Sequence, residues 1–121
     1  MILVTGARGF VGSRIMEQFS EAEAFPGELS RTGEAEAIAA YVQRTHPAII
    51  FHTAAISDIG ACEKDPEASY RANVLLPVAL ARAAQAAGAK LVAFSSDQVY
   101  TGCPDGGPYA DGIDLPEPAN V

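Results

Sequence analysis

The chain has 121 residues, a length typical of one globular domain. Its 49% hydrophobic content can fill a core, and no stretch approaches the ~20 apolar residues of a membrane span. The formal net charge of −7 disfavours nucleic acid and anionic membranes as partners. Cys62 and Cys103 form no CxxC pair, so we expect reduced cysteines in a cytoplasmic protein.

The first twelve residues predict a strand, a glycine turn and the start of a helix. The run from Met1 to Thr5 is apolar and rich in branched residues, as in a buried strand. Three glycines follow at a spacing of three: Gly6, Gly9 and Gly12. A helix is expected from Phe10 to Ser20, and its N-terminus would offer unpaired N–H groups to a pyrophosphate. The alternative is a tight turn that packs the strand on the helix without a ligand.

The segment from Glu21 to Arg31 is short for a dinucleotide-binding fold. Such folds place a second strand here, followed by an acidic residue that bonds the ribose hydroxyls. We expect any second strand to be short, because Pro26-Gly27 closes it abruptly. Glu28 is the acidic residue that follows, either as a cofactor contact or, as we prefer, as a solvated loop carboxylate.

A helix and a strand are expected between Thr32 and His52. Thr32 is the predicted N-cap of the helix, and Pro47 ends it. Ala48 to His52 is then a continuous apolar strand, typical of a parallel sheet covered on both faces. We expect His52 to be a hydrogen-bonded histidine at the strand end. The apolar face of the helix has the spacing i, i+3, i+4, i+7: Ala35, Ile38, Ala39 and Val42. Small residues at the carboxyl end of the strand, where open α/β sheets bind ligands, are Thr53, Ala54 and Ala55.

The residues from Asp65 to Gly88 predict one long helix with an irregular turn inside it. Asp65 is the N-cap, Pro66 suits the first helical position, and Gly88 is the C-cap. Because Pro77 lies within the helix, we expect a kink or irregular turn near Asn73.

A further strand is expected from Lys90 to Phe94, ending in Ser95-Ser96-Asp97 at the same ligand edge. The residues from Gln98 to Val121 are rich in Gly, Pro and Asp and predict mostly loop. Strands that alternate with helices predict an α/β fold, a doubly wound parallel sheet with right-handed crossovers.

Four motifs along the chain carry a resemblance to a known family. They are Thr5-Gly6-Ala7-Arg8-Gly9-Phe10-Val11-Gly12, then His52-Thr53-Ala54-Ala55, then Asn73, then Ser95-Ser96-Asp97-Gln98-Val99-Tyr100. In this order they resemble the extended short-chain dehydrogenase/reductases. Within that group the chain looks most like the dTDP-4-dehydrorhamnose reductases and related sugar-nucleotide-binding proteins. The resemblance implies that residues 1–121 form a Rossmann-like NAD(P)-binding domain, truncated before the substrate domain.

The resemblance also implies a role for each matching residue. Ala54 and Ala55, preceded by Thr53, match a small-residue motif that passes the adenosine and the nicotinamide ribose. Asn73 matches an asparagine that supports the active-site end of the long helix. Ser96 matches the catalytic Ser/Thr that bonds the substrate carbonyl oxygen, and the alternative is a strand-end hydroxyl that satisfies local backbone. The remaining cofactor contacts are Gly6, Arg8, Gly9, Phe10, Val11, Gly12 and Ser95, and no metal site is expected.

Two features leave the function partly open. The cofactor is NADP or NAD, since Arg8 has room for a 2′-phosphate but is equally an exposed turn arginine. The family's catalytic Tyr-x-x-x-Lys does not occur, because neither Lys64 nor Lys90 has a tyrosine four residues before it. We therefore expect the N-terminal part of an NAD(P)-dependent sugar-nucleotide reductase, inactive by itself.

Two other functions stay open: a non-catalytic dinucleotide-binding regulatory module and an inactive fragment. The expected partners are a dinucleotide and, in the full-length protein, a nucleotide sugar. The strand from Lys90 to Ser95 is expected at an exposed sheet edge, which favours self-association into a homo-oligomer.

Overall fold

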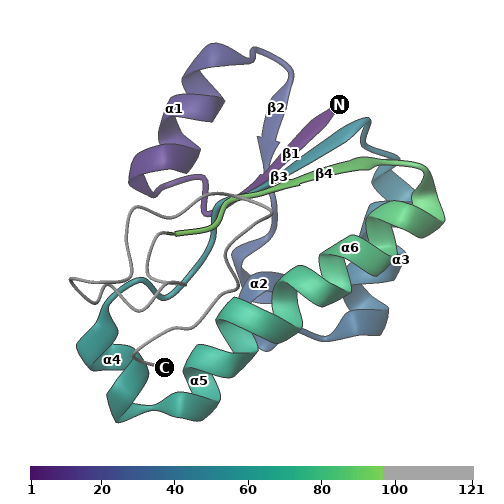
Figure 1. The fold of residues 1–121 in the computed structure, drawn as a ribbon. Coiled ribbons are helices and arrows are strands. Elements are labelled where there is room, and N and C mark those ends of the chain that lie inside the picture. The colour runs from purple at the N-terminus through teal and green to yellow at the C-terminus, as the bar shows by residue number, and fades with distance from the viewer. Residues whose placement is uncertain (97–121) are drawn as a thin grey trace, which may run out of the picture.

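The computed structural model describes residues 1–96, which form a parallel sheet with helices on both faces (Figure 1). The strand order is β2-β1-β3-β4, and each neighbouring pair is parallel. Strand β2 lies on one side of β1, and β3 and β4 lie on the other side. This reversal of strand order at β1 confirms the doubly wound fold. The strands are β1 (Ile2–Thr5), β2 (Ala22–Ala24), β3 (Ile49–His52) and β4 (Lys90–Ala93).

In the described part of the chain, three helices cover the sheet. Helices α3 and α6 pack together on one face, and α1 lies on the other face against β1 and β2 (Figure 1). None of the helices in residues 1–96 has both the length and the apolar run needed to cross a membrane. The helical segments are α1 (Phe10–Gln18), α2 (Gly27–Thr32), α3 (Ala35–Thr45), α4 (Ile59–Lys64), α5 (Pro66–Tyr70), the π-helical η1 (Arg71–Leu75) and α6 (Leu76–Ala87).

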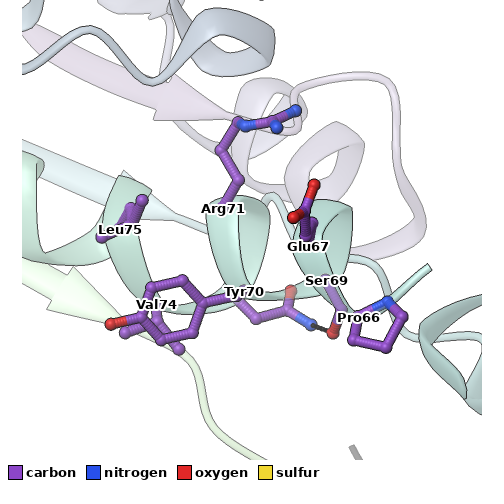
Figure 2. A pocket seen from close by; sticks show the side chains of 8 residues that line it. Pro66, Glu67, Ser69, Tyr70, Arg71, Val74 and Leu75 are labelled. Carbon is purple, nitrogen blue, oxygen red and sulfur yellow. Dashed lines mark hydrogen bonds between the residues drawn. The ribbon is translucent and has the colours of Figure 1, made fainter.

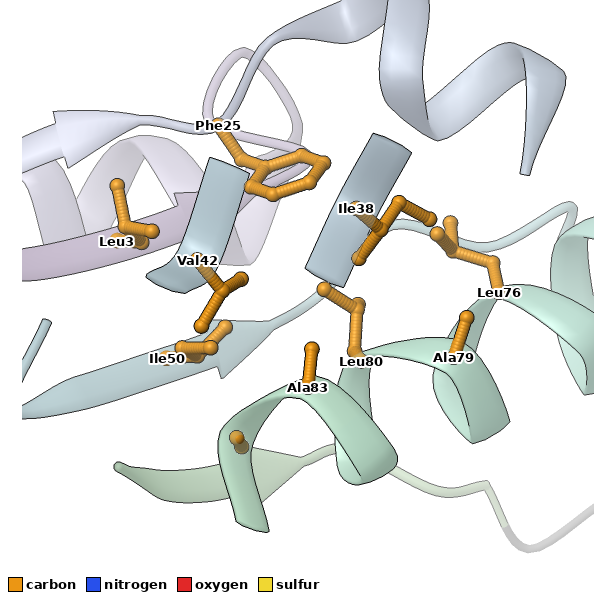
Figure 3. Packing of buried hydrophobic residues seen from close by; sticks show 10 residues of the cluster. Leu3, Phe25, Ile38, Val42, Ile50, Leu76, Ala79, Leu80 and Ala83 are labelled. Atoms are coloured by element: carbon orange, nitrogen blue, oxygen red, sulfur yellow. The ribbon is translucent and has the colours of Figure 1, made fainter. Parts of the chain in front are cut away.

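The main core lies between the sheet and the α3–α6 pair (Figure 3). Each helix contributes two buried side chains one turn apart, Ile38 and Val42 from α3 and Leu76 and Leu80 from α6. The central strands β1 and β3 contribute Leu3 and Ile50. On the other face Phe19, the C-cap residue of α1, stacks on Phe51 of β3 with ring centroids 5.8 Å apart. Both faces of the central strands are thus covered, as their apolar sequence predicts.

The expected start of α3 was wrong. Thr32 is the last residue of α2, and Glu34 takes the N-cap position of α3 without a side-chain hydrogen bond. Of the four residues on the predicted apolar face of α3, Ile38 and Val42 are buried in the core, whereas Ala35 and Ala39 are exposed. The short second strand was confirmed as β2, whereas helix α2 stands where a loop was expected.

The long helix has the irregular turn that its sequence predicts. Asp65 Oδ1 accepts a hydrogen bond from the Ala68 N–H at 3.0 Å, which confirms the N-cap. The turn from Arg71 to Leu75 is π-helical, and it separates α5 from α6. Gly88 ends α6 with φ 71°.

Candidate functional site

The glycine turn between β1 and α1 is packed tightly against the end of β3. Gly6 has φ 66°, and a Cβ there would lie 2.8 Å from Thr53 Oγ1. A Cβ at Gly12 would overlap the Gly6 carbonyl oxygen and lie 2.7 Å from the Gly6 carbonyl carbon. Both positions therefore need glycine for the packing of the turn itself.

Gly9 is under a weaker packing constraint. A Cβ there would meet the Gly6 carbonyl oxygen at 3.2 Å, and its φ of −75° suits any residue. Gly9 is the N-cap of α1, and no side chain caps the helix start in the described part of the chain. The neighbours Arg8, Phe10 and Val11 are exposed. The missing side chain of Gly9 thus leaves the N-terminal N–H groups of α1 open to an anion.

A buried threonine joins the ends of β1 and β3. Thr5 Oγ1 accepts hydrogen bonds from the Thr53 and Ala54 N–H groups, both at 3.1 Å, and lies 2.7 Å from His52 Nδ1. Because the hydroxyl already accepts twice, its own proton is donated to Nδ1, so His52 is neutral with its proton on Nε2. Thr53 Oγ1 in turn donates to the Thr5 carbonyl oxygen at 2.7 Å. His52 is therefore a hydrogen-bonded strand-end histidine, as predicted.

The stability of the domain should fall as the pH drops below neutral. Burial lowers the pKa of His52 from its ordinary value of 6.5, because the imidazolium loses its hydration. Below about pH 6.5 the unfolded chain then binds more protons than the folded one, so the free energy of unfolding decreases. Above that pH the contribution of His52 is fully present.

Urea denaturation at pH 7.5 and 5.5 checks this expectation. His52→Asn keeps an acceptor for the Thr5 hydroxyl without titrating in this range, so its pH dependence should be shallower than that of the wild type. His46→Asn, the same change at an exposed histidine, is the matched control. An unchanged slope in His52→Asn would contradict the assignment.

Asn73 holds the loop that follows β3. Its Oδ1 accepts from the Ile56 N–H at 2.9 Å, and its Nδ2 donates to the Ile56 carbonyl oxygen at 3.0 Å. Nδ2 also lies 3.4 Å from Ser69 Oγ in α5. The side chain therefore ties the loop after β3 to the long helix.

The predicted site residues gather at one edge of the sheet. The glycine turn follows β1, Thr53 to Ala55 follow β3, and Ser95-Ser96 follow β4, which pairs with β3 in register (His52 with Ala93). The predicted loop from Gln98 to Val121 lies outside the described residues, as does Asp97. The order along the edge suits a ligand that runs across the ends of several strands.

Residues 54–76 of the described chain line two hollows, one of them together with α2. One of about 280 Å³ is lined by Ala54, Ala55 and Ile56 and by residues of α2 and η1, including Arg31 and Arg71. The other, about 640 Å³, is open and runs along the helix where Tyr70 and Val74 lie (Figure 2). Because the smaller hollow contains the predicted Ala54-Ala55 pair, it is the candidate for a ligand site. Sequence reasoning missed Arg31 and Arg71, since no motif links positions so far apart.

Several known proteins are similar to this chain. A solved dTDP-4-dehydrorhamnose reductase from Bacillus anthracis, in complex with NADP, is 31% identical with a TM-score of 0.86, over 98% of this chain and 43% of that one. A solved UDP-glucose 4-epimerase from Thermus thermophilus, in complex with NAD, is 25% identical with a TM-score of 0.79, over 98% of this chain and 45% of that one. The rat methionine adenosyltransferase 2 subunit beta is 30% identical, over 99% of this chain and 38% of the subunit.

The chain thus spans less than half the length of each of these relatives. The part that it matches in the reductases is N-terminal, as the resemblance implied. The family model of the RmlD substrate binding domain matches residues 1–121, which is the whole chain. The chain therefore belongs to the RmlD substrate binding domain family and is homologous to the N-terminal part of dTDP-4-dehydrorhamnose reductase-like proteins.

Proposed function

We propose that the chain binds a nicotinamide dinucleotide and forms the cofactor half of an NAD(P)-dependent sugar-nucleotide reductase. The observation that carries the proposal is Gly9. A Cβ at Gly9 would make a much milder contact than one at Gly6 or Gly12, so the packing of the turn does not by itself require glycine at this position. Glycine there keeps the start of α1 open. An open helix N-terminus at the end of the first strand fits a pyrophosphate. Relatives solved with NADP and with NAD support the same assignment.

The other site residues take roles along the sheet edge. We assign the pyrophosphate to the turn, where Arg8, Phe10 and Val11 flank Gly9. Bound dinucleotide would supply a hydride for a carbonyl carbon. The small residues after β3 would let its ribose lie close to the backbone: Thr53, Ala54 and Ala55. Asn73 would hold that loop, Ser95 would border the nicotinamide end, and the Ser96 hydroxyl would donate to the carbonyl oxygen of the substrate.

Thermal unfolding with and without NADPH or NADH tests the binding claim. A ligand that binds only the folded state stabilises it by about 2.7 kcal/mol at a concentration of 100 Kd, so Tm should rise with either nucleotide that binds. Gly9→Val should abolish the rise, because its side chain would occupy the pyrophosphate position. Gly60→Ala, at an exposed glycine of α4, is the control and should keep the full rise. A Tm that neither nucleotide moves at millimolar concentration would refute the proposal.

A second candidate is a non-catalytic dinucleotide-binding subunit. The similarity to a methionine adenosyltransferase subunit beta covers nearly the whole chain and favours this function. Both functions include binding of the dinucleotide. They differ in whether its nicotinamide end reacts with a substrate. A full-length protein that oxidises NADPH or NADH with a dTDP-4-dehydro sugar, and loses this in Ser96→Ala, is a reductase. Dinucleotide binding without such turnover supports the subunit.

We also propose that the protein works in the cytoplasm and forms a homo-oligomer. Cys62 is buried and unpaired, which suits a reducing compartment. Within residues 1–96, β4 is an edge strand of the sheet, and open edges favour association.

A further inference from the structure

We propose that His52 is a positioning residue for the dinucleotide: its neutral ring orients the Thr5 hydroxyl that holds both cofactor loops, and a second proton on the ring releases them. The inference rests on the proposed function. His52 is 5% exposed at the end of β3, so it would act on the cofactor through Thr5 and not by direct contact. Proton uptake and dinucleotide binding should therefore oppose each other in this chain.

The hydrogen bonds around Thr5 leave one place for the proton of its hydroxyl. A hydroxyl has one proton to donate and two lone pairs to accept with. Thr5 Oγ1 accepts from the Thr53 and Ala54 N–H groups, both at 3.1 Å, so its proton points at His52 Nδ1, 2.7 Å away. A second proton on the ring would occupy Nδ1 itself. Two protons would then lie between Nδ1 and Oγ1, and Thr5 could accept the new bond only by giving up an N–H group of the loop.

The same network holds the two loops that we assign to the dinucleotide. Thr5 Oγ1 fixes the start of the loop after β3, where Ala54 would pass the ribose. Thr53 Oγ1 donates to the Thr5 carbonyl oxygen at 2.7 Å and lies 3.4 Å from the Gly6 carbonyl oxygen in the glycine turn. A Cβ at Gly6 or Gly12 would come within 2.9 Å of this Thr53 oxygen, so the turn and Thr53 are in close contact. A shift of the loop after β3 would therefore move the pyrophosphate turn as well.

The surroundings of His52 favour the neutral ring. Within residues 1–96, no acidic or basic side chain besides His52 is buried. Its partners across the sheet are the uncharged Thr5 in β1 and Ala93 in β4. His52 shares a face of the sheet with Ile50, and α3 and α6 cover that face. Burial therefore lowers the pKa of His52, which keeps the ring neutral at pH 7.5. The charged side chains of α3, α6 and the adjoining η1 are all exposed, and the half-buried Tyr41 completes the titratable groups on these elements: Glu36, Tyr41, Arg44, Arg71 and Arg82.

Binding of oxidised NAD and NADP to the chain between pH 7.5 and 5.5 tests the inference. If only the unprotonated form binds, the apparent Kd doubles at the pH where half of the folded molecules carry the second proton. We therefore expect the Kd of the wild type to rise at least about twofold over this range. His52→Asn offers the Thr5 hydroxyl an oxygen that does not titrate, so its pH dependence should be that of the ligand alone. His46→Asn is the matched control, because His46 precedes β3 at the end of the strand remote from the cofactor loops, and it should retain the wild-type rise in Kd.

The imidazole signals of the wild type give a second measurement that needs no variant. The chain has two histidines, so NMR can follow His52 with and without saturating NAD, and the His46 signal is an internal reference. Linkage requires that bound dinucleotide lower the pKa of His52, because the ligand favours the unprotonated ring. The negative charge of the pyrophosphate by itself would raise that pKa, so the sign of the change separates the two effects.

The outcomes separate this inference from the proposed function. If neither nucleotide binds at pH 7.5, the proposed function fails and the role of His52 fails with it. If a nucleotide binds but the wild-type and His52→Asn curves are parallel, the positioning role is refuted and dinucleotide binding survives. The same holds if bound NAD raises the pKa of His52 or leaves it unchanged. If His52→Asn does not fold, the sign of the pKa change decides alone.

Discussion

Gly12→Ala should destabilise the domain by at least about 3 kcal/mol, because the added Cβ would overlap a backbone oxygen that has no free space to move into. That oxygen belongs to Gly6, and a Cβ at Gly12 would also lie 2.9 Å from Thr53 Oγ1. A side chain could rotate away from such a contact. Here β1, the turn and α1 would have to separate, and the contact of the turn with β3 would be lost with them.

Gly9→Ala is the matched comparison, since it makes the same chemical change three residues earlier in the same turn. Its Cβ would meet one carbonyl oxygen at 3.2 Å, and its backbone dihedral is ordinary, so we expect a cost below about 1 kcal/mol. Urea denaturation of the two variants and the wild type measures the difference. If the two variants were equally stable, Gly12 would not be the packing residue of the turn.

Local patterns predicted the parts of the fold that depend on neighbouring residues. The strand, the glycine turn and the start of α1 are contiguous, so their sequence contains most of the required information. The irregular turn near Asn73 has a local cause as well. Pro77 has no N–H to donate to the carbonyl of Asn73 four residues earlier, so regular α-helix cannot continue there. The structure has the π-helical turn from Arg71 to Leu75 at this place.

The failures lie where two local rules compete or where distant residues meet. Pro26-Gly27 closes the short strand β2 as expected, but proline with an acidic residue soon after it also suits a helix start, and here Pro26 is the N-cap of the unexpected helix α2. The shared hollow of Arg31 and Arg71 depends on how α2 and η1 approach each other. No spacing along the chain contains that information, so sequence reasoning could not find the pair.

Thr5 is the residue whose role depends most on the register of the sheet. It lies opposite His52 in the β1–β3 pair, and its side chain is fully buried there. The position of a threonine before a glycine turn does not indicate that its hydroxyl will bind the end of β3. Only the register brings its hydroxyl to His52 and to the backbone of Thr53 and Ala54.

Thr5→Val should therefore cost about 3 kcal/mol, although valine has nearly the same shape and is more apolar. The change would leave the N–H groups of Thr53 and Ala54 and the Nδ1 of His52 without their shared partner. The loop after β3 would then shift, and the small residues proposed to pass the cofactor ribose would move with it. We expect the affinity for NADPH to fall together with the stability.

Thr5→Ser separates the hydroxyl from the packing. It removes one buried methyl group and keeps all three hydrogen bonds, so its cost should be near 1 kcal/mol, below that of Thr5→Val. Urea denaturation and NADPH titration of the three proteins at pH 7.5 measure both effects. If Thr5→Val were as stable as Thr5→Ser, the hydroxyl network would contribute nothing, and side-chain packing alone would hold the ends of β1 and β3 together.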